Sequence, residues 1–233
     1  MGLDYVIAYV VAAPPVVSLP VAGTNARFPV RRVYCVGRNY AAHAREYGHD
    51  EKLPPFFFAK SADMIAQDGT TIPYPPITQN YHHEVELVAA IGKGGANISA
   101  ANAWDHVYGY AVGFDMTRRD VQQAAAKAGR PWEIGKSFDN SAPCGPVHPA
   151  SSVGHIASGK IEITVNGEVR QSSDIDLMIW DVAHIIEHLS KQVTLEPGDL
   201  IFTGTPEGVS AVAAGDVLIG HVDKLGVLTI KIG

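Results

Sequence analysis

The stretch HHEVELVAAIGKGG, residues 82 to 95, places two glutamates in a run that is otherwise apolar. Apart from Glu86, residues 85 to 91 are apolar, which is typical of a strand that is buried on both faces. Side chains two positions apart on a strand point to the same side, so Glu84 and Glu86 should lie together. Buried carboxylates need a cation or a shared proton, and this pair therefore predicts a metal site.

Two carboxylates without nearby cysteines favour a hard ion, Mg²⁺ or Mn²⁺. Asp115 is the best candidate for a third oxygen ligand, because it follows the apolar run VYGYAVGF and precedes a predicted helix. Sites often form where strands end in loops. Taken alone, Asp115 is explained equally well as a turn residue, so the prediction depends on the set Glu84, Glu86 and Asp115.

The adjacent histidines raise a rival interpretation. His82 and Glu84 form the His-x-Glu that opens the zinc-deaminase signature, and Pro143 with Cys144 could begin its second half. That half requires Pro-Cys-x-x-Cys, and position 147 is a valine. The rival lacks a ligand, so His82 and His83 are expected to support the site or the fold.

Composition limits the classes of function. The 233 residues predict one large domain or two small ones, and 46% apolar with 18% charged residues is a normal globular balance. A net charge of -6 without a basic block disfavours nucleic acid and anionic membranes as partners. Only Cys35 and Cys144 are present, which argues against a disulfide framework and suits a reducing cytoplasm.

The strand and helix signals predict a β-rich α+β fold. Strands are expected over residues 107 to 116, around the Asn166-Gly167 hairpin turn, and in three segments near the C-terminus. Helices are expected over residues 38 to 49, after a capping box of Thr117 and Asp120, and from about 177 to 190. They are too few for a doubly wound sheet, so we expect a rolled or sandwiched sheet with peripheral helices.

Residues 1 to 32 are expected to form an N-terminal extension, and residues 33 to 233 the main domain. The apolar segment VIAYVVAAPPVV, residues 6 to 17, is shorter than the ~20 residues of a membrane span and follows no basic residue. We expect a strand or arm that packs on the body.

Several further residues are candidates for chemistry. His43 and Glu46 lie three apart on the first predicted helix, an arrangement that suits a general base oriented by a carboxylate. Lys60, Lys136 and Thr205 could hold an anionic substrate or stabilise an oxyanion. Each pattern also has an ordinary explanation: an exposed ion pair, surface lysines, or a plain turn.

Seven segments, in this order along the chain, resemble the fumarylacetoacetate hydrolase family. They are YCVGRNYAAHAREYG, PPFFFAK, HHEVEL, GYAVGFDMTRRDVQ, PWEIGKSFDNSAPCGP, NGEVRQ and LIFTGTPEGV. The resemblance implies the mixed β-roll of that family's C-terminal domain over residues 33 to 233, and a homodimer. It implies Mg²⁺ or Mn²⁺ on Glu84, Glu86 and Asp115. It also implies catalytic roles for His43, Glu46 and Lys136, and substrate contacts from Arg38, Lys60, Arg118, Gln122 and Thr205.

The resemblance implies cleavage of a carbon–carbon bond in an acylpyruvate, such as fumarylpyruvate and water giving fumarate and pyruvate in gentisate breakdown. Members of the family also decarboxylate oxaloacetate or tautomerise and isomerise oxo-acids at the same metal, so these reactions stay open. A catalytically silent binding protein on this fold is a third possibility, which predicts missing ligands. All candidate ligand positions are filled.

Overall fold

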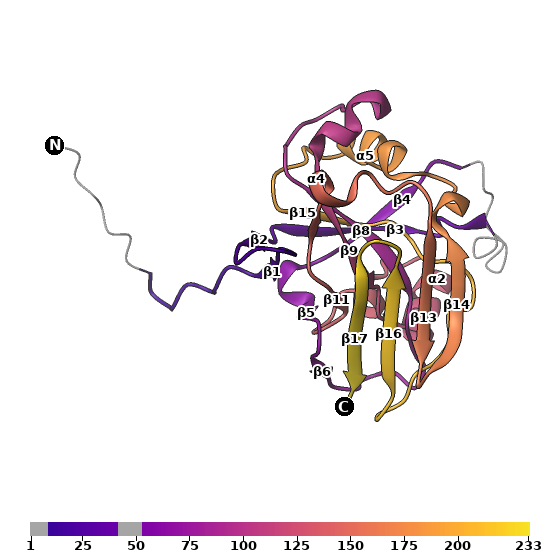
Figure 1. The fold of residues 1–233 in the computed structure, drawn as a ribbon. Coiled ribbons are helices and arrows are strands. Elements are labelled where there is room, and N and C mark those ends of the chain that lie inside the picture. Colours follow the sequence, from indigo (N-terminus) through magenta and orange to yellow (C-terminus); the bar gives the residue numbers. More distant parts are fainter. Residues whose placement is uncertain (1–8, 42–52) are drawn as a thin grey trace.

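The computed structural model describes residues 9–41 and 53–233, and the expected β-rich α+β architecture is confirmed (Figure 1). A mixed sheet of eight strands has the order β4-β3-β15-β8-β9-β11-β5, with β12 paired to β9. A second sheet of five strands has the order β14-β13-β16-β17-β6. Two short two-stranded sheets, β1-β2 and β10-β7, complete the described strands.

The strands are β1 (Ser18–Pro20), β2 (Arg27–Pro29), β3 (Arg32–Gly37), β4 (Phe56–Lys60), β5 (Ile65–Gln67), β6 (Thr71–Ile72), β7 (Tyr81–His82), β8 (Val85–Ile91), β9 (Val107–Phe114), β10 (Thr117–Arg118), β11 (Ala142–Cys144), β12 (His148–Pro149), β13 (Lys160–Val165), β14 (Glu168–Asp174), β15 (Asp199–Phe202), β16 (Val217–Val222) and β17 (Gly226–Ile232). The helices are η1 (Ala62–Met64), η2 (Ala100–His106), α2 (Arg119–Lys127), α3 (Glu133–Lys136), α4 (Ala150–Val153), η3 (Ile175–Leu177) and α5 (Val182–Ser190).

Strand β8 lies at the centre of the larger sheet and is buried along its whole length. Its residues alternate between two apolar clusters: Leu87 and Ala89 pack into the larger one, while Val88 and Ala90 pack into the smaller one. Both faces of the strand are therefore covered, which explains the uninterrupted apolar run. Glu86 lies two positions before Val88 on the strand. Its side chain therefore points to the same face as that of Val88, toward the smaller cluster.

The hairpin between β13 and β14 forms as predicted. Val165 pairs with Glu168, which leaves Asn166 and Gly167 as the two turn residues. Their φ angles are 53° and 83°, the positive values that a type I′ turn requires. The three C-terminal segments also form strands, β15, β16 and β17, and β13, β14, β16 and β17 lie side by side in Figure 1.

The predicted helix starts need correction. The capping box is wrong: Thr117 belongs to β10, and its hydroxyl donates to the carbonyl of Asp115 at 3.0 Å. Helix α2 begins at Arg119 instead. The helix expected from about residue 177 begins at Val182, where the Asp181 carboxylate accepts from the amide of His184 at 2.9 Å. Most of the helix expected over residues 38 to 49 lies outside the described residues.

The N-terminal segment does not pack as predicted. Residues 9 to 16 extend away from the body in Figure 1 and are exposed, with Tyr9 at 68% and Val10 at 102% of full exposure. The following β1–β2 hairpin does pack, because Leu19 and Phe28 are buried in the smaller apolar cluster. No helix within the described residues is both long and apolar enough to cross a membrane.

Candidate active site

The structure brings the three predicted metal ligands together. Glu84 directly precedes β8, Glu86 lies within it, and Asp115 follows the neighbouring strand β9. The antiparallel pairing of Val85 with Phe114 aligns the two strand ends, and the amide of Asp115 donates to the carbonyl of Glu84 at 2.9 Å. All three side chains are buried, and one carboxylate oxygen from each lies within 4.8 Å of the others.

Three cationic side chains surround two of these carboxylates. The Lys136 Nζ lies 2.8 Å from Glu84 Oε2 and 2.6 Å from Asp115 Oδ2. The Lys60 Nζ lies 2.9 Å from Asp115 Oδ1, and Arg119 forms an ion pair with Glu84 Oε1. Burial lowers the pKa of Lys136, but the Asp115 and Glu84 carboxylates outweigh burial, so this pKa is raised and the ammonium stays charged.

Glu86 differs from the other two carboxylates. It is 1% exposed, and none of the ion pairs among the described residues includes it. Its Oε2 accepts a hydrogen bond from the amide of Gly204 at 2.8 Å. Burial first, and then the Asp115 and Glu84 carboxylates, raise the pKa of Glu86 well above its usual range. A dication beside Glu86 would relieve this cost, so the donor set fits Mg²⁺ or Mn²⁺.

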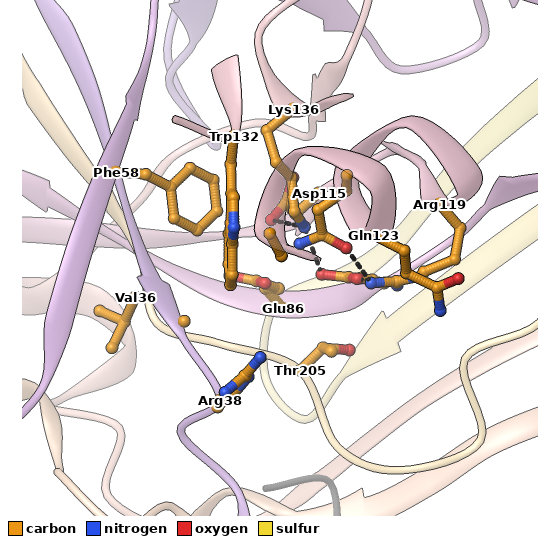
Figure 2. Close-up of a pocket in the computed structure, with 14 residues that line it drawn as sticks. Val36, Arg38, Phe58, Glu86, Asp115, Arg119, Gln123, Trp132, Lys136 and Thr205 are labelled. Atoms are coloured by element: carbon orange, nitrogen blue, oxygen red, sulfur yellow. Dashed lines mark hydrogen bonds and ion pairs between the residues drawn. The ribbon is translucent and has the colours of Figure 1, made fainter. Parts of the chain in front are cut away.

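A pocket with about 510 Å³ of space, part of it open to solvent, lies over the carboxylates. Figure 2 shows Phe58 and Trp132 beside each other at one side of the pocket, with Arg38 and Thr205 at another. The Arg38 guanidinium lies 5.6 Å from the centre of the Trp132 ring. An apolar wall with a few charged groups is typical of a small-molecule site.

Three of the predicted substrate contacts, Arg38, Gln122 and Thr205, line this pocket. Lys60 and Arg118 are not among its lining residues. The Lys60 ammonium is bound by the carbonyls of Met116, Lys136 and Ser141, besides Asp115. The Arg118 guanidinium stacks 4.1 Å from the Phe138 ring and donates to the carbonyl of Ile134. His43 and Glu46 lie outside the described residues.

Sequence reasoning missed Arg119. This residue is 3% exposed, lines the pocket, and donates to Gln122 Oε1 at 2.7 Å besides its ion pair with Glu84. The signal was the adjacent pair Arg118-Arg119 in the segment DMTRRD. Without the position of the β10–α2 junction, the sequence does not say which arginine turns inward.

His82 and His83 are not among the residues that line the pocket. Burial lowers the pKa of each to about 4, so both are neutral at physiological pH. His83 Nδ1 lies 3.0 Å from Gln171 Oε1, and its Nε2 lies 2.9 Å from Ser210 Oγ.

With this geometry established, comparison with known proteins identifies the family. The family model of the fumarylacetoacetate (FAA) hydrolase C-terminal domain matches residues 32–232. The chain belongs to the fumarylacetoacetate hydrolase family, which confirms the resemblance and the expected fold type. A curated fumarylpyruvate hydrolase from Ralstonia sp is 47% identical over 178 residues, which is 76% of this chain and 92% of that protein.

The chain is also similar to a solved fumarylpyruvate hydrolase structure and to curated proteins that act on oxaloacetate. The crystal structure of fumarylpyruvate hydrolase from Pseudomonas aeruginosa in complex with Mn²⁺ and pyruvate superposes with a TM-score of 0.94 and 55% identity, covering 97% of this chain and 99% of that one. The mitochondrial oxaloacetate tautomerase of Homo sapiens is 40% identical over 202 residues, or 87% of this chain and 91% of that protein. The mitochondrial oxaloacetate decarboxylase of Dictyostelium discoideum is 40% identical over 189 residues, or 81% of this chain and 87% of that protein.

Proposed function

We propose that this protein is a metal-dependent hydrolase that cleaves a carbon–carbon bond in an acylpyruvate, converting fumarylpyruvate and water to fumarate and pyruvate. The observation that carries this proposal is the buried cluster of Glu84, Glu86 and Asp115 at the base of a pocket with cationic and aromatic walls. The fumarylpyruvate hydrolases of Ralstonia sp and Pseudomonas aeruginosa support the choice of substrate. This reaction would place the enzyme in the breakdown of aromatic compounds through gentisate.

The metal would be Mg²⁺ or Mn²⁺, held by one carboxylate from each of Glu84, Glu86 and Asp115. When bound, the dication supplies Lewis acidity that stabilises negative charge on the oxo-acid half of the substrate as the bond breaks. The Pseudomonas aeruginosa structure, which contains Mn²⁺, supports a divalent ion here.

The protein residues supply the proton transfers and the orientation. In the proposed reaction His43, oriented by Glu46, takes a proton from water as the water oxygen attacks the fumaryl carbonyl. The bond between that carbonyl carbon and the pyruvate methylene then breaks. Its electron pair remains on the pyruvate fragment, which gains a proton to become pyruvate, while the fumaryl fragment keeps the water oxygen as fumarate.

Lys136 would act through its charge. Its ammonium has three N–H bonds, which point to Glu84, Asp115 and the hydroxyl of Thr117 within 2.8 Å. Direct donation to a developing oxyanion would require one of these bonds to be released. In the proposed roles Lys136 and Lys60 therefore hold the carboxylates in place, and their positive charge favours the transition state.

Thr205 would contact the substrate through its backbone amide. Its hydroxyl already donates to the carbonyl of Val85 at 2.8 Å and accepts from Gln171 at 2.8 Å. The hydrogen of that hydroxyl is therefore not available to a substrate carboxylate. The Thr205 amide is not used by a hydrogen bond among the described residues, so it is the donor that we assign to the substrate.

A second candidate function is the decarboxylation or tautomerisation of oxaloacetate at the same metal. The curated relatives that carry these names support it at about 40% identity. These reactions need the metal but no attacking water. The pair His43 and Glu46 is the feature that favours hydrolysis.

Metal removal and substrate choice are tested in one experiment. The purified protein is offered fumarylpyruvate, other acylpyruvates and oxaloacetate, with Mn²⁺, with Mg²⁺ and with excess EDTA. We expect loss of the enol absorbance of fumarylpyruvate, formation of fumarate and pyruvate in equal amounts, and no reaction in EDTA. Turnover of oxaloacetate alone would replace the proposed function by the second candidate, and turnover in EDTA would refute metal dependence.

We further propose a homodimer in the cytoplasm. Cys35 and Cys144 are both buried and unpaired, which suits a reducing compartment. The extended residues 9 to 16 expose Tyr9, Val10, Val11 and Val16, and apolar exposure of this extent suits burial against a second copy.

The double variant Val10→Asp and Val11→Asp is expected to weaken the dimer, because it places charges where apolar contacts would form. Light scattering coupled to size exclusion should show the wild type at twice the mass of one chain and the variant shifted toward one chain at equal concentration. Val227→Asp, at an exposed valine of β17, serves as the control. A double variant that dimerises like the wild type would exclude residues 9 to 16 from the dimer interface.

A further inference from the structure

Gln171 has no role in the proposed reaction, yet it occupies a central position near the site. It is the last residue of the NGEVRQ segment and lies on β14, in the sheet that does not carry the metal ligands. Its side chain is 1% exposed, although glutamine is a residue that usually faces water. A buried amide needs partners for all of its polar atoms, and these partners show what it holds together.

Gln171 joins the metal-ligand strand to the loop of residues 203 to 211. Its Oε1 accepts from the amide of Val85 at 3.1 Å, directly between Glu84 and Glu86. Its Nε2 donates to Thr205 Oγ1 at 2.8 Å and to the carbonyl of Pro206 at 2.7 Å. The same side chain therefore contacts the backbone of the metal strand and two residues of the loop that lines the pocket.

The direction of every one of these hydrogen bonds follows from the partners. The Pro206 carbonyl can only accept and the Val85 amide can only donate, so the orientation of the Gln171 amide is fixed. His83 Nδ1, 3.0 Å from Gln171 Oε1, must then carry its proton. His83 Nε2 accepts from the Ser210 hydroxyl at 2.9 Å, and this hydrogen bond holds the C-terminal end of the 203–211 loop. A glutamate could not reproduce the two donors of the amide.

The loop needs this support because of its own geometry. Gly204 has a φ of 97°, a region that favours glycine, and an added Cβ would lie 2.6 Å from the Cβ of Asn39. In this conformation its amide reaches Glu86 Oε2 at 2.8 Å, and the next residue, Thr205, lines the pocket. A shift of the loop would therefore move the amides at the pocket relative to the carboxylates.

We propose that Gln171 is a positioning residue, which fixes the distance between the carboxylate strand and the 203–211 loop and so sets how substrate is held over the metal. This role rests on the proposed function of the site. Supporting residues of this kind are typically worth 10- to 100-fold, and a displacement of about 1 Å at a site can cost as much. The effect should fall on substrate binding more than on metal binding, because Gln171 touches no carboxylate.

The test uses Gln171→Glu, which keeps the length and Oε1 but turns the Nε2 donor into an oxygen that faces the Pro206 carbonyl. Gln171→Met, which removes all four hydrogen bonds at similar volume, is the stronger second variant. Ser190→Ala is the control. Ser190 is a buried residue at the end of helix α5, and its hydroxyl oxygen accepts from the amide of Ile98 at 2.9 Å. Loss of this hydrogen bond lowers the stability of the protein without changing the site. Three quantities are measured for each protein: KM and kcat with fumarylpyruvate, the affinity for Mn²⁺ by calorimetry, and the rate of amide hydrogen exchange along the chain.

For Gln171→Glu we expect KM to rise at least tenfold, Mn²⁺ affinity to stay within about threefold, and exchange in residues 203 to 211 to become at least tenfold faster. Gln171→Met should show the same loop exchange and also a loss of Mn²⁺ affinity, because the Val85 amide loses its acceptor. Ser190→Ala should change neither KM nor the loop. An unchanged KM or unchanged loop exchange in Gln171→Glu would overturn the proposal, as would exchange that accelerates equally along the chain. An inactive wild type would refute the proposed function, while the exchange measurement would still test Gln171.

Discussion

Glu86→Gln is expected to lose tight Mn²⁺ binding and at least about 10²-fold of turnover, while the metal-free protein becomes more stable to heat. The loss follows because the amide removes one of the three proposed anionic ligands, which must cost at least as much as the 10- to 100-fold typical of residues that only support ligands. The gain in stability follows because Glu86 is buried beside Asp115 and Glu84 and has no ion-pair partner among the described residues, so a neutral side chain removes repulsion and desolvation.

Calorimetric titration with Mn²⁺ and thermal melts with and without the metal measure the two effects. Glu168→Gln makes the same chemical change at an exposed position of β14 and should behave as the wild type. A Glu86→Gln protein that binds Mn²⁺ as tightly as the wild type would remove Glu86 from the ligand set. A lower melting temperature without metal would show that Glu86 stabilises the fold as a carboxylate.

His43→Ala is expected to lower hydrolysis of fumarylpyruvate by about 10²- to 10⁴-fold, the range typical of a general base, and to leave Mn²⁺ affinity unchanged. His43 lies outside the described residues, so this expectation comes from the family motif and from the need for a base to activate water. Steady-state kinetics and Mn²⁺ calorimetry on the same samples separate the two effects. His221→Ala, on β16 of the other sheet, is the matched control.

The same variant distinguishes the two candidate functions. Decarboxylation and tautomerisation of oxaloacetate need no attacking water, so any such activity should survive His43→Ala better than hydrolysis does. Near-normal turnover of fumarylpyruvate would show that another group activates the water. Equal loss of both reactions would show that His43 serves a step common to them.

Local patterns in the sequence predicted that Glu84, Glu86 and Asp115 lie together, as they do in the structure. The apolar run of β8 is continuous because its two faces enter two different cores, and this also explains why its glutamates are buried. Asp115 was found because it follows an apolar run and precedes a predicted helix. In the structure, the end of β9 lies next to the start of its antiparallel neighbour β8. The Asn166-Gly167 turn was found because few other residue pairs adopt two positive φ angles.

The parts that escaped prediction depend on contacts between distant segments. The Lys60 ammonium is bound by carbonyls 56 to 81 positions away. The sequence predicted a substrate contact for Lys60, and nothing near it in the sequence shows that these carbonyls hold its ammonium. The Thr117 hydroxyl donates to the carbonyl of Asp115, so Thr117 does not cap helix α2 as the sequence pattern predicted. Whether Arg118 or Arg119 faces the pocket depends on the turn between β10 and α2.

The balance of charge at the site has a consequence for the order in which ligands arrive. Lys60, Lys136 and Arg119 form ion pairs with two of the three acidic side chains, Glu84 and Asp115, so the chain can fold around the site before an ion is present. A dication then leaves the site with surplus positive charge, which the two carboxylates of fumarylpyruvate can neutralise. Ion first and oxo-acid second is thus the sequence of addition that electrostatics favours, and release of the products restores a positively charged site ready for the next turnover.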